Sequence, residues 1–143
     1  MPKKYANFQL TIKVLIFNDK GDILVVHTPE GFMDFPGGRV DETEENFSYQ
    51  DILQRELSEE IGDNFEYILG NFAFITRRFY KLYENNCHIL AIFYEAKYLR
   101  GEIQLSKEHT SFEWINSKKL LKKNKNCFAS TEEYIQLNQY FDR

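Results

Sequence analysis

The sequence predicts one α/β domain over residues 1–143, with a mixed central sheet flanked by helices. Three observations support this prediction. The chain has 143 residues, an ordinary length for a single domain. Hydrophobic residues make up 43% of it, enough for a packed interior. Strand-like and helical stretches follow one another in an order typical of a mixed sheet between helices.

The first two strands are predicted to form a hairpin. In residues 8–17, Leu10, Ile12, Val14 and Ile16 occupy every second position, which indicates a strand with one buried face. The stretch "NDKGD" at 18–22 is typical of a turn, and "ILVVHT" at 23–28 predicts the second strand. A loop over 29–38 follows, with three glycines and two prolines.

The first helix is predicted from about residue 48 to residue 62. Leu53, Leu57 and Ile61 recur at intervals of four residues and form one apolar stripe. Gly62 is a natural stop at the C-terminal end. The stripe predicts that this helix packs on the sheet.

The second half of the chain supplies the remaining elements. Strands are predicted at 65–80, 88–99 and 112–115, with a loop between the last two. A short helix is predicted at 117–122, followed by a basic break. The stretch "STEE" at 130–133 has the spacing of a capping box and predicts a final helix that runs towards Phe141.

Charge and cysteine content exclude several classes of protein. The net charge of −4 argues against a general nucleic-acid binder, although an anionic small substrate is compatible with it if a metal cation is bound. Cys87 and Cys127 are too few for a disulfide scaffold and lack zinc-site spacing. Lys13 interrupts the apolar start, so we expect neither a signal peptide nor a membrane span. We expect a cytoplasmic protein that is a monomer or a homodimer.

An acidic cluster ends the first helix. Glu56, Glu59 and Glu60 in "RELSEEIG" at 55–62 share one edge beside the apolar stripe. Repulsion between them and the negative end of the helix dipole both oppose this arrangement. The cluster is either a solvated acidic face or a site for a divalent cation, which would cancel both costs. The glycine-rich loop before the helix favours the cation site.

With this loop and helix, the sequence resembles the Nudix hydrolases. The family signature places five residues between Gly38 and Glu44 and ends in the "RELSEEIG" pattern, which is complete here. The lead-in "FPGGRVDE", the flanking strands and the "EHTSFEWI" stretch also fit the family. The resemblance spans most of the chain and implies a Nudix-like α/β/α sandwich.

The chain departs from the signature at two points. Ten residues rather than the usual seven separate Glu44 from Arg55, so the signature glutamate corresponds either to Glu44 or, counted back from Arg55, to Phe47. We prefer Glu44 and expect the extra residues to lengthen the loop before the helix. The second departure is Asp63, where an apolar residue is usual, and we expect Phe65 to take over its packing.

The resemblance implies roles for the acidic residues. Glu56 and Glu60 would be the principal ligands of Mg²⁺ (or Mn²⁺), and Glu59 would join a second ion or its shell. The carbonyl of Gly38 would add an oxygen ligand. Arg55 would orient the glutamates rather than contact the substrate.

Further residues are candidates with competing interpretations. The general base is Glu108, in the loop before the Trp-containing strand, or Glu56. Arg39 is a candidate phosphate contact or a surface arginine. Arg77, with Arg78 and Lys81, is a candidate for steering the substrate or a solvated strand end. His109 is expected to be solvated.

The activity implied by the resemblance is Mg²⁺-dependent hydrolysis of a nucleoside diphosphate linked to another group. The short chain favours a nucleoside triphosphate, cleaved to the monophosphate and pyrophosphate. Nucleotide sugars and dinucleoside polyphosphates are alternative substrates. Two rival functions are a non-catalytic Nudix-like module that binds nucleotides and an unrelated α/β protein with a structural acidic helix.

Overall fold

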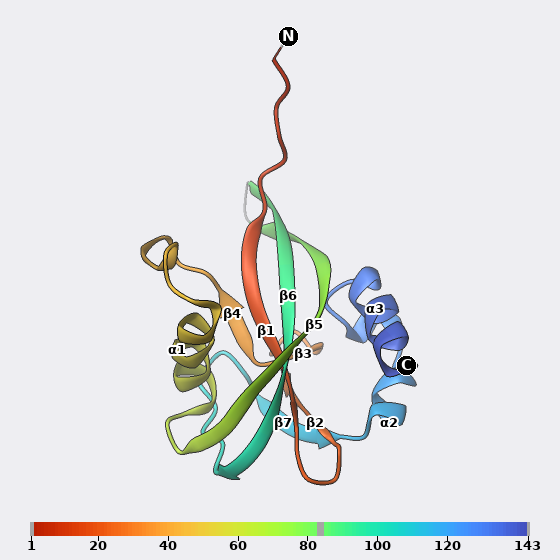
Figure 1. The fold of residues 1–143 in the computed structure, drawn as a ribbon. Helices are drawn as coiled ribbons and strands as arrows, with labels where there is room; N and C mark the ends of the chain where they lie inside the picture. The colour runs from red at the N-terminus through yellow and green to blue at the C-terminus, as the bar shows by residue number, and fades with distance from the viewer. Residues whose placement is uncertain (1, 83–84, 143) are drawn as a thin grey trace.

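The computed structural model describes residues 2–82 and 85–142 (Figure 1). The strands are β1 (Gln9–Phe17), β2 (Ile23–His27), β3 (Met33–Asp34), β4 (Gly37–Arg39), β5 (Phe65–Leu82), β6 (Asn85–Gly101) and β7 (Ser111–Ile115). The helices are α1 (Tyr49–Ile61), α2 (Ser117–Leu121) and α3 (Thr131–Phe141), with short 3₁₀ turns η1 (Glu42–Glu44) and η2 (Lys125–Cys127). The predicted strands and helices are present in kind and order. The loop predicted at 29–38 also contains the short strand β3 and the start of β4, and the turns η1 and η2 were not predicted.

The sheet is mixed, as predicted. Strand β1 runs parallel to β6 along its whole length, from Gln9↔Ile89 to Phe17↔Lys97. The other strand pairs are antiparallel: β5 with β6, β4 with β1, and both β3 and β7 with β2. The β4 pairing places the glycine-rich loop directly beside β1.

The predicted β1–β2 hairpin forms only at its turn. The two strands pair antiparallel at Phe17↔Ile23, and from there they diverge. The edges of β1 are taken by β6 and β4, while β2 pairs with β7 and β3. The turn was therefore predicted correctly, but the extent of the pairing was wrong because other strands compete for the same edges.

Two apolar layers pack on opposite faces of the sheet, which gives the predicted α/β/α sandwich (Figure 1). On one face, Leu53, Leu57 and Ile61 of α1 pack with Ile12 and other residues of β1, and Phe65 joins them as expected. On the other face, Leu120 and Leu137 of the C-terminal helices pack with residues of β1, β2, β5 and β6. The sandwich fixes α1 across the sheet from α3.

Helix caps follow the local sequence with one exception. Ser48 caps α1, and Ser130 caps α3 by accepting a hydrogen bond from the Glu133 backbone N–H. The predicted reciprocal half of the capping box at Ser130 is wrong, because the carboxylate of Glu133 binds Arg78 instead. A complete capping box forms at η1, between Asp41 and Glu44.

No helix in the described residues is long and apolar enough to cross a membrane. Both cysteines are free thiols, Cys87 buried and Cys127 partly exposed.

Candidate active site

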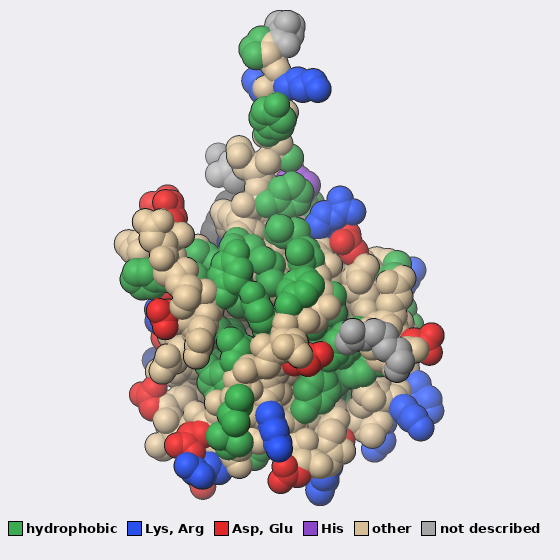
Figure 2. Space-filling model, viewed as in Figure 1, with side chains coloured by type: hydrophobic (Ala, Val, Ile, Leu, Met, Phe, Trp, Pro, Cys, Tyr) green, Lys and Arg blue, Asp and Glu red, His purple; other side chains and the backbone are tan. Residues whose placement is uncertain are grey.

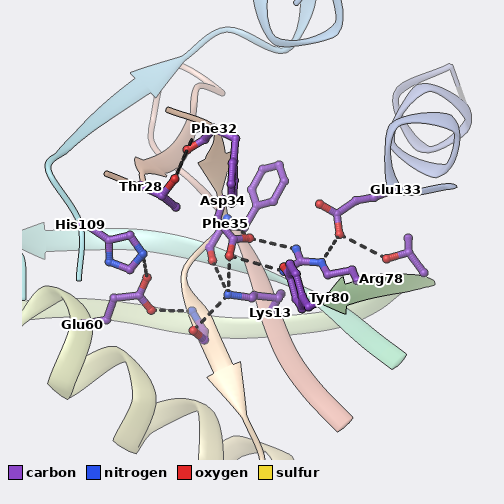
Figure 3. A network of polar contacts seen from close by, with 12 residues as sticks. Lys13, Thr28, Phe32, Asp34, Phe35, Glu60, Arg78, Tyr80, His109 and Glu133 are labelled. Carbon is purple, nitrogen blue, oxygen red and sulfur yellow. Dashed lines mark hydrogen bonds and ion pairs between the residues drawn. The ribbon is translucent and has the colours of Figure 1, made fainter. Parts of the chain in front are cut away.

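The acidic end of α1 lies against the glycine-rich loop and β1 (Figure 3). Glu60 is the most buried of its glutamates, with 5% of the residue exposed. Its Oε2 accepts a hydrogen bond from the backbone N–H of Gly37 at 2.9 Å. Its Oε1 is buried and has no hydrogen-bond partner among the described residues, and His109 Nε2 lies 3.5 Å from it. Burial raises the pKa of Glu60 to about 7.

Glu56, one turn before Glu60, packs directly on Gly38. A Cβ atom added to Gly38 would lie 2.2 Å from Glu56 Oε2, so the carboxylate occupies the space that a side chain at position 38 would fill. Burial raises the pKa of Glu56 above its ordinary value, although Arg55 Nη2 donates to its Oε1 at 2.7 Å. The backbone of Gly38, the partly buried carboxyl group of Glu56 and the buried one of Glu60 therefore share one small region.

Arg55 links the acidic residues on its side of the helix. Its Nε donates to Glu44 Oε2 at 2.5 Å and its Nη2 to Glu44 Oε1 at 2.7 Å. The hydrogen bonds from Arg55 are the main reason that the pKa of the Glu44 carboxyl lies below its ordinary value. Of the two candidates for the signature glutamate, Glu44 is thus the one that contacts Arg55, while Phe47 is exposed.

Glu59 points to solvent. Its side chain is 64% exposed, and it accepts from Arg55 Nη1 at 3.1 Å. Residues 45–48 separate η1 from α1. They lie in the loop before the helix, which we expected the extra residues between Glu44 and Arg55 to lengthen.

The oxygen atoms of Glu56, Glu60 and Gly38 are of the kind that a hard divalent cation binds. Across residues 2–82 and 85–142, no three carboxylate, imidazole or thiol groups already converge as a metal cluster. Nevertheless, Glu60 has a buried carboxyl oxygen without a hydrogen-bond partner. Glu56 lies one helical turn away and packs against the backbone of Gly38, which has no side chain. Carboxylate and carbonyl oxygens are the ligands that Mg²⁺ prefers. The residues therefore fit the cation, because Glu60 Oε1 is a buried oxygen whose missing hydrogen bond a cation could replace.

Replacing Gly38 with alanine is expected to lower the turnover of a substrate by at least about 100-fold, because misplacing a catalytic group by 1 Å has this effect. The new Cβ must push the Glu56 carboxylate out of its position. Steady-state kinetics of Gly38→Ala measure the loss. Gly21→Ala is the control: Gly21 has φ +79° but no atom near its Cβ position, so strain lowers stability without affecting turnover.

The loop between β6 and β7 closes over the C-terminal end of α1. The backbone N–H of Gln104 donates to Ile61 O at 2.9 Å, and that of Ser106 donates to Glu60 O at 3.0 Å. His109 lies in the same loop with its side chain 11% exposed, facing Glu60. The expectation that His109 is solvated was wrong, because these backbone bonds bring the loop down onto the helix.

The other sequence candidates lie elsewhere in the described structure. Glu108, next to His109, is exposed. Arg39 Nη1 donates to Gln9 Oε1 at 2.8 Å, and Arg77 Nε donates to Glu132 Oε2 on α3 at 2.9 Å. None of these three side chains is within hydrogen-bond distance of a glutamate of α1 in the described residues. The side chain of Lys81 lies outside what is described.

A buried network of charges adjoins the glutamates and was not predicted. Lys13 Nζ donates to Asp34 Oδ2 at 3.0 Å and to Gly37 O at 3.2 Å, while the Gly37 N–H donates to Glu60 (Figure 3). Arg78 Nη2 donates to Asp34 Oδ1 at 2.9 Å, and its Nε donates to Glu133 Oε1 at 2.7 Å. The polar contacts thus run from α1 to α3, through the sheet.

The network corrects the interpretation of Arg78 as part of a solvated or substrate-steering strand end. Arg78 is buried, whereas Arg77 beside it is exposed, because adjacent residues of a strand point to opposite faces. One sequence signal could have identified the network: Lys13 is a charged residue in the middle of an otherwise apolar strand.

The free energy of unfolding is expected to decrease as pH falls below about 4, because Asp34 of the unfolded chain then binds a proton while the folded chain still keeps this carboxylate charged. Burial alone would raise the pKa of Asp34, but Arg78 and Lys13 more than offset burial and hold it well below its ordinary range. The unfolded chain therefore binds this proton at a higher pH than the folded chain. Urea unfolding from about pH 2 to pH 5 measures the slope. Asp34→Asn should flatten it, and an unchanged slope would contradict the assignment.

Comparison with known proteins gives a family match over most of the chain. Residues 7–134 match the family model described as the NUDIX domain. No curated protein matches the sequence.

Solved structures with the same fold share little sequence with this chain. A MutT protein from Methanosarcina mazei Go1 has a TM-score of 0.75 at 22% identity, over 98% of this chain and 97% of its own. A MutT NUDIX hydrolase from Burkholderia pseudomallei has a TM-score of 0.68 at 22% identity, over 94% and 98%. An ADP-ribose pyrophosphatase from Streptococcus suis 89-1591 has a TM-score of 0.65 at 20% identity, over 95% and 91%.

Proposed function

This chain belongs to the Nudix family of hydrolases, and from that premise we propose that it hydrolyses a phosphoanhydride bond in a nucleotide with the help of Mg²⁺. The substrate class is a nucleoside diphosphate linked to another group. We favour a nucleoside triphosphate, in which water attacks phosphorus and the products are the nucleoside monophosphate and pyrophosphate.

One observation carries the proposal. Glu60 is buried at the C-terminal end of α1, next to Glu56 and the backbone of Gly38, and its Oε1 has no hydrogen-bond partner among the described residues, with His109 Nε2 3.5 Å away. A buried carboxylate without a partner is costly, and the helix dipole adds to the cost at this end. A bound divalent cation would offset both costs, so the arrangement is understandable as a binding site rather than as a structural feature.

The chain's own residues would divide the work. Glu56, Glu60 and the Gly38 carbonyl would hold the cation, and Glu59 would turn from Arg55 towards a second ion. When bound, the cation neutralises the charge of the phosphate oxygens and orients water. Arg55, fixed by its two bonds to Glu44, would keep Glu56 and Glu59 in place.

We assign the general base to Glu56 rather than to Glu108. Glu56 lies against Gly38 one helical turn from Glu60, beside the place where the cation would be held, whereas Glu108 is exposed in its loop. Glu56→Gln is therefore expected to lose at least about 100-fold in turnover, and Glu108→Gln less than about tenfold. Their kcat values measure the difference. A larger loss of kcat in Glu108→Gln than in Glu56→Gln would assign the general base to Glu108 instead.

A panel of substrates tests the proposed reaction. Nucleoside triphosphates, ADP-ribose, nucleotide sugars and dinucleoside polyphosphates would be incubated with Mg²⁺, and then with Mg²⁺ and a chelator. Phosphorus NMR identifies the products. Release of pyrophosphate from a nucleoside triphosphate, abolished by chelation, is the expected result. Because an ADP-ribose pyrophosphatase shares the fold, preferential cleavage of ADP-ribose would replace the triphosphate as substrate.

The rival function is a non-catalytic module that binds nucleotides. It would need no buried carboxyl group beside Gly38, and this chain keeps the three glutamates of the signature. Binding of a nucleotide without turnover of any member of the panel would favour the rival.

The two free thiols are consistent with a cytoplasmic protein.

A further inference from the structure

One face of the sheet extends beyond the helix that covers it. Strand β5 has 18 residues and β6 has 17, whereas α1 has 13. At about 3.3 Å per residue in a strand and 1.5 Å in a helix, the strands are about 60 Å long and the helix about 20 Å. The part of this face beyond α1 is therefore left without a covering helix (Figure 1).

This uncovered part is apolar and continuous. Five half-exposed side chains lie on it or at its margin: Phe72, Ile75 and Phe79 belong to β5, Phe8 precedes β1, and Tyr49 begins α1. We call these five the overhang patch. Cross-strand neighbours join them, since Phe72 lies opposite Tyr94 and Ile75 opposite Ile92. The rings of Phe8 and Phe79 both pack on His88, at 5.6 and 4.9 Å between centroids. Figure 2 shows hydrophobic side chains gathered there, over β1, β6 and β5.

The charge next to the overhang patch is directed away from it. Between Ile75 and Phe79, the residue on the same face of β5 is Arg77. Its Nε donates to Glu132 of α3, which packs on the opposite face of the sheet. The guanidinium therefore reaches around the edge of the sheet and is paired there. Among the described residues, the ionisable side chain inside the patch is His88, whose ring contacts those of Phe8 and Phe79.

The area of the overhang patch matches one side of a protein interface. A large side chain offers about 200 Å², so five half-exposed ones offer about 500 Å², and their partly exposed neighbours raise this to about 700 Å². A standard interface buries about 800 Å² per partner, and apolar patches of this size on monomers mark interaction sites. A net charge of −4 disfavours an anionic lipid surface as the occupant.

We infer that the overhang patch is the interface of a two-fold homodimer. A mainly apolar surface whose neighbouring arginine is paired with Glu132 matches its own copy with little like-charge repulsion, and a two-fold axis brings the same surface to both sides. Bulges interrupt β5 between Leu69 and Phe74, so the face of the sheet, rather than its edge, makes the contact. The interface uses none of the glutamates of the proposed active site and stands independently of the proposed function.

Sedimentation velocity over a range of protein concentrations tests the inference. The wild-type chain is expected to sediment at twice its 17.1 kDa mass. Ile75→Lys should raise the dissociation constant at least about 100-fold, because the two-fold axis buries the new charge twice. Ile135→Lys is the matched control: Ile135 lies on α3 with 47% exposed, against 44% for Ile75, and this change should leave the dimer intact.

Phe79→Lys serves as a second disruption of the patch. Circular dichroism, together with substrate turnover where turnover is found, verifies that the variants fold. Three results would overturn the inference. The first is a wild-type chain that stays monomeric at every concentration, whether or not it binds neutral vesicles or another protein. The second is that Ile75→Lys and Phe79→Lys both remain dimers, which would place the interface elsewhere. The third is that Ile135→Lys dissociates to the same extent as Ile75→Lys.

Discussion

Replacing Glu60 with glutamine is expected to lower turnover by at least about 1,000-fold while the fold is kept. This corresponds to about 4 kcal/mol of lost transition-state stabilisation, within the range that a catalytic metal ion supplies. The glutamine oxygen can still accept the hydrogen bond from Gly37, so the loop keeps its anchor. What the variant loses is the charged oxygen Oε1, which has no hydrogen-bond partner among the described residues and faces His109 Nε2 at 3.5 Å. Release of phosphate or pyrophosphate measures turnover.

A thermal melt separates loss of the cation from loss of the fold. Without Mg²⁺, Glu60→Gln should melt at the wild-type temperature or above it, because a buried acid with a pKa raised to about 7 is replaced by a neutral group. With Mg²⁺ at about 100 times its Kd, the wild type should gain about 2.7 kcal/mol and the variant almost nothing. Glu66→Gln, at an exposed ion pair with Arg100, is the control and should behave as wild type. Mg²⁺-dependent turnover by Glu60→Gln within tenfold of wild type would refute the role of Glu60.

The parts of the site that could be predicted from sequence are local ones. The stripe of Leu53, Leu57 and Ile61 is a property of one helix, and so is the spacing of Glu56 and Glu60. The contact of Glu56 with Gly38 follows from the pairing of β4 with β1, which brings the loop to the helix. Glu60 is the most buried of the α1 glutamates, and one of its oxygens lacks a hydrogen bond. Both features depend on how the helix lies on the loop. The sequence pattern does not contain this information.

The parts that were missed depend on contacts between distant residues. Lys13 binds Asp34 at a separation of 21 residues, and Arg78 binds Asp34 and Glu133 at 44 and 55. Each pair is fixed by strand register and by the docking of α3, which no local pattern specifies. Glu133 illustrates the competition: its sequence position suits a capping box, but a buried arginine is a stronger partner for its carboxylate than a backbone N–H. His109 was missed for the same reason, since its loop folds onto the end of α1.

Removing the charge of Arg78 is expected to destabilise the fold more than any surface change. Arg78→Met should lower the free energy of unfolding by about 3 kcal/mol, because breaking a buried ion pair leaves an uncompensated charge behind. Here the stranded groups are Glu133, which among the described residues keeps the hydrogen bond from Thr76, and Asp34, which keeps Lys13. Urea unfolding at neutral pH measures the loss.

The neighbouring residue provides a matched control for this prediction. Arg77 makes the same kind of bond to the preceding residue of α3, Glu132, but on the surface. Arg77→Met should therefore cost less than about 1 kcal/mol, because exposed ion pairs contribute little. The two arginines differ in burial rather than in chemistry, so the difference between the variants isolates the effect of burial.

A double-mutant cycle then shows whether the stranded carboxylate causes the loss. Adding Glu133→Gln to Arg78→Met should recover at least about 1 kcal/mol, since the glutamine is neutral and its oxygen still accepts from Thr76. Additive losses from the two changes would mean that the cost of Arg78→Met comes from lost packing, for example over the ring of Phe93, 5.8 Å away. In that case the connection from α1 to α3 would be a set of independent contacts rather than one coupled network.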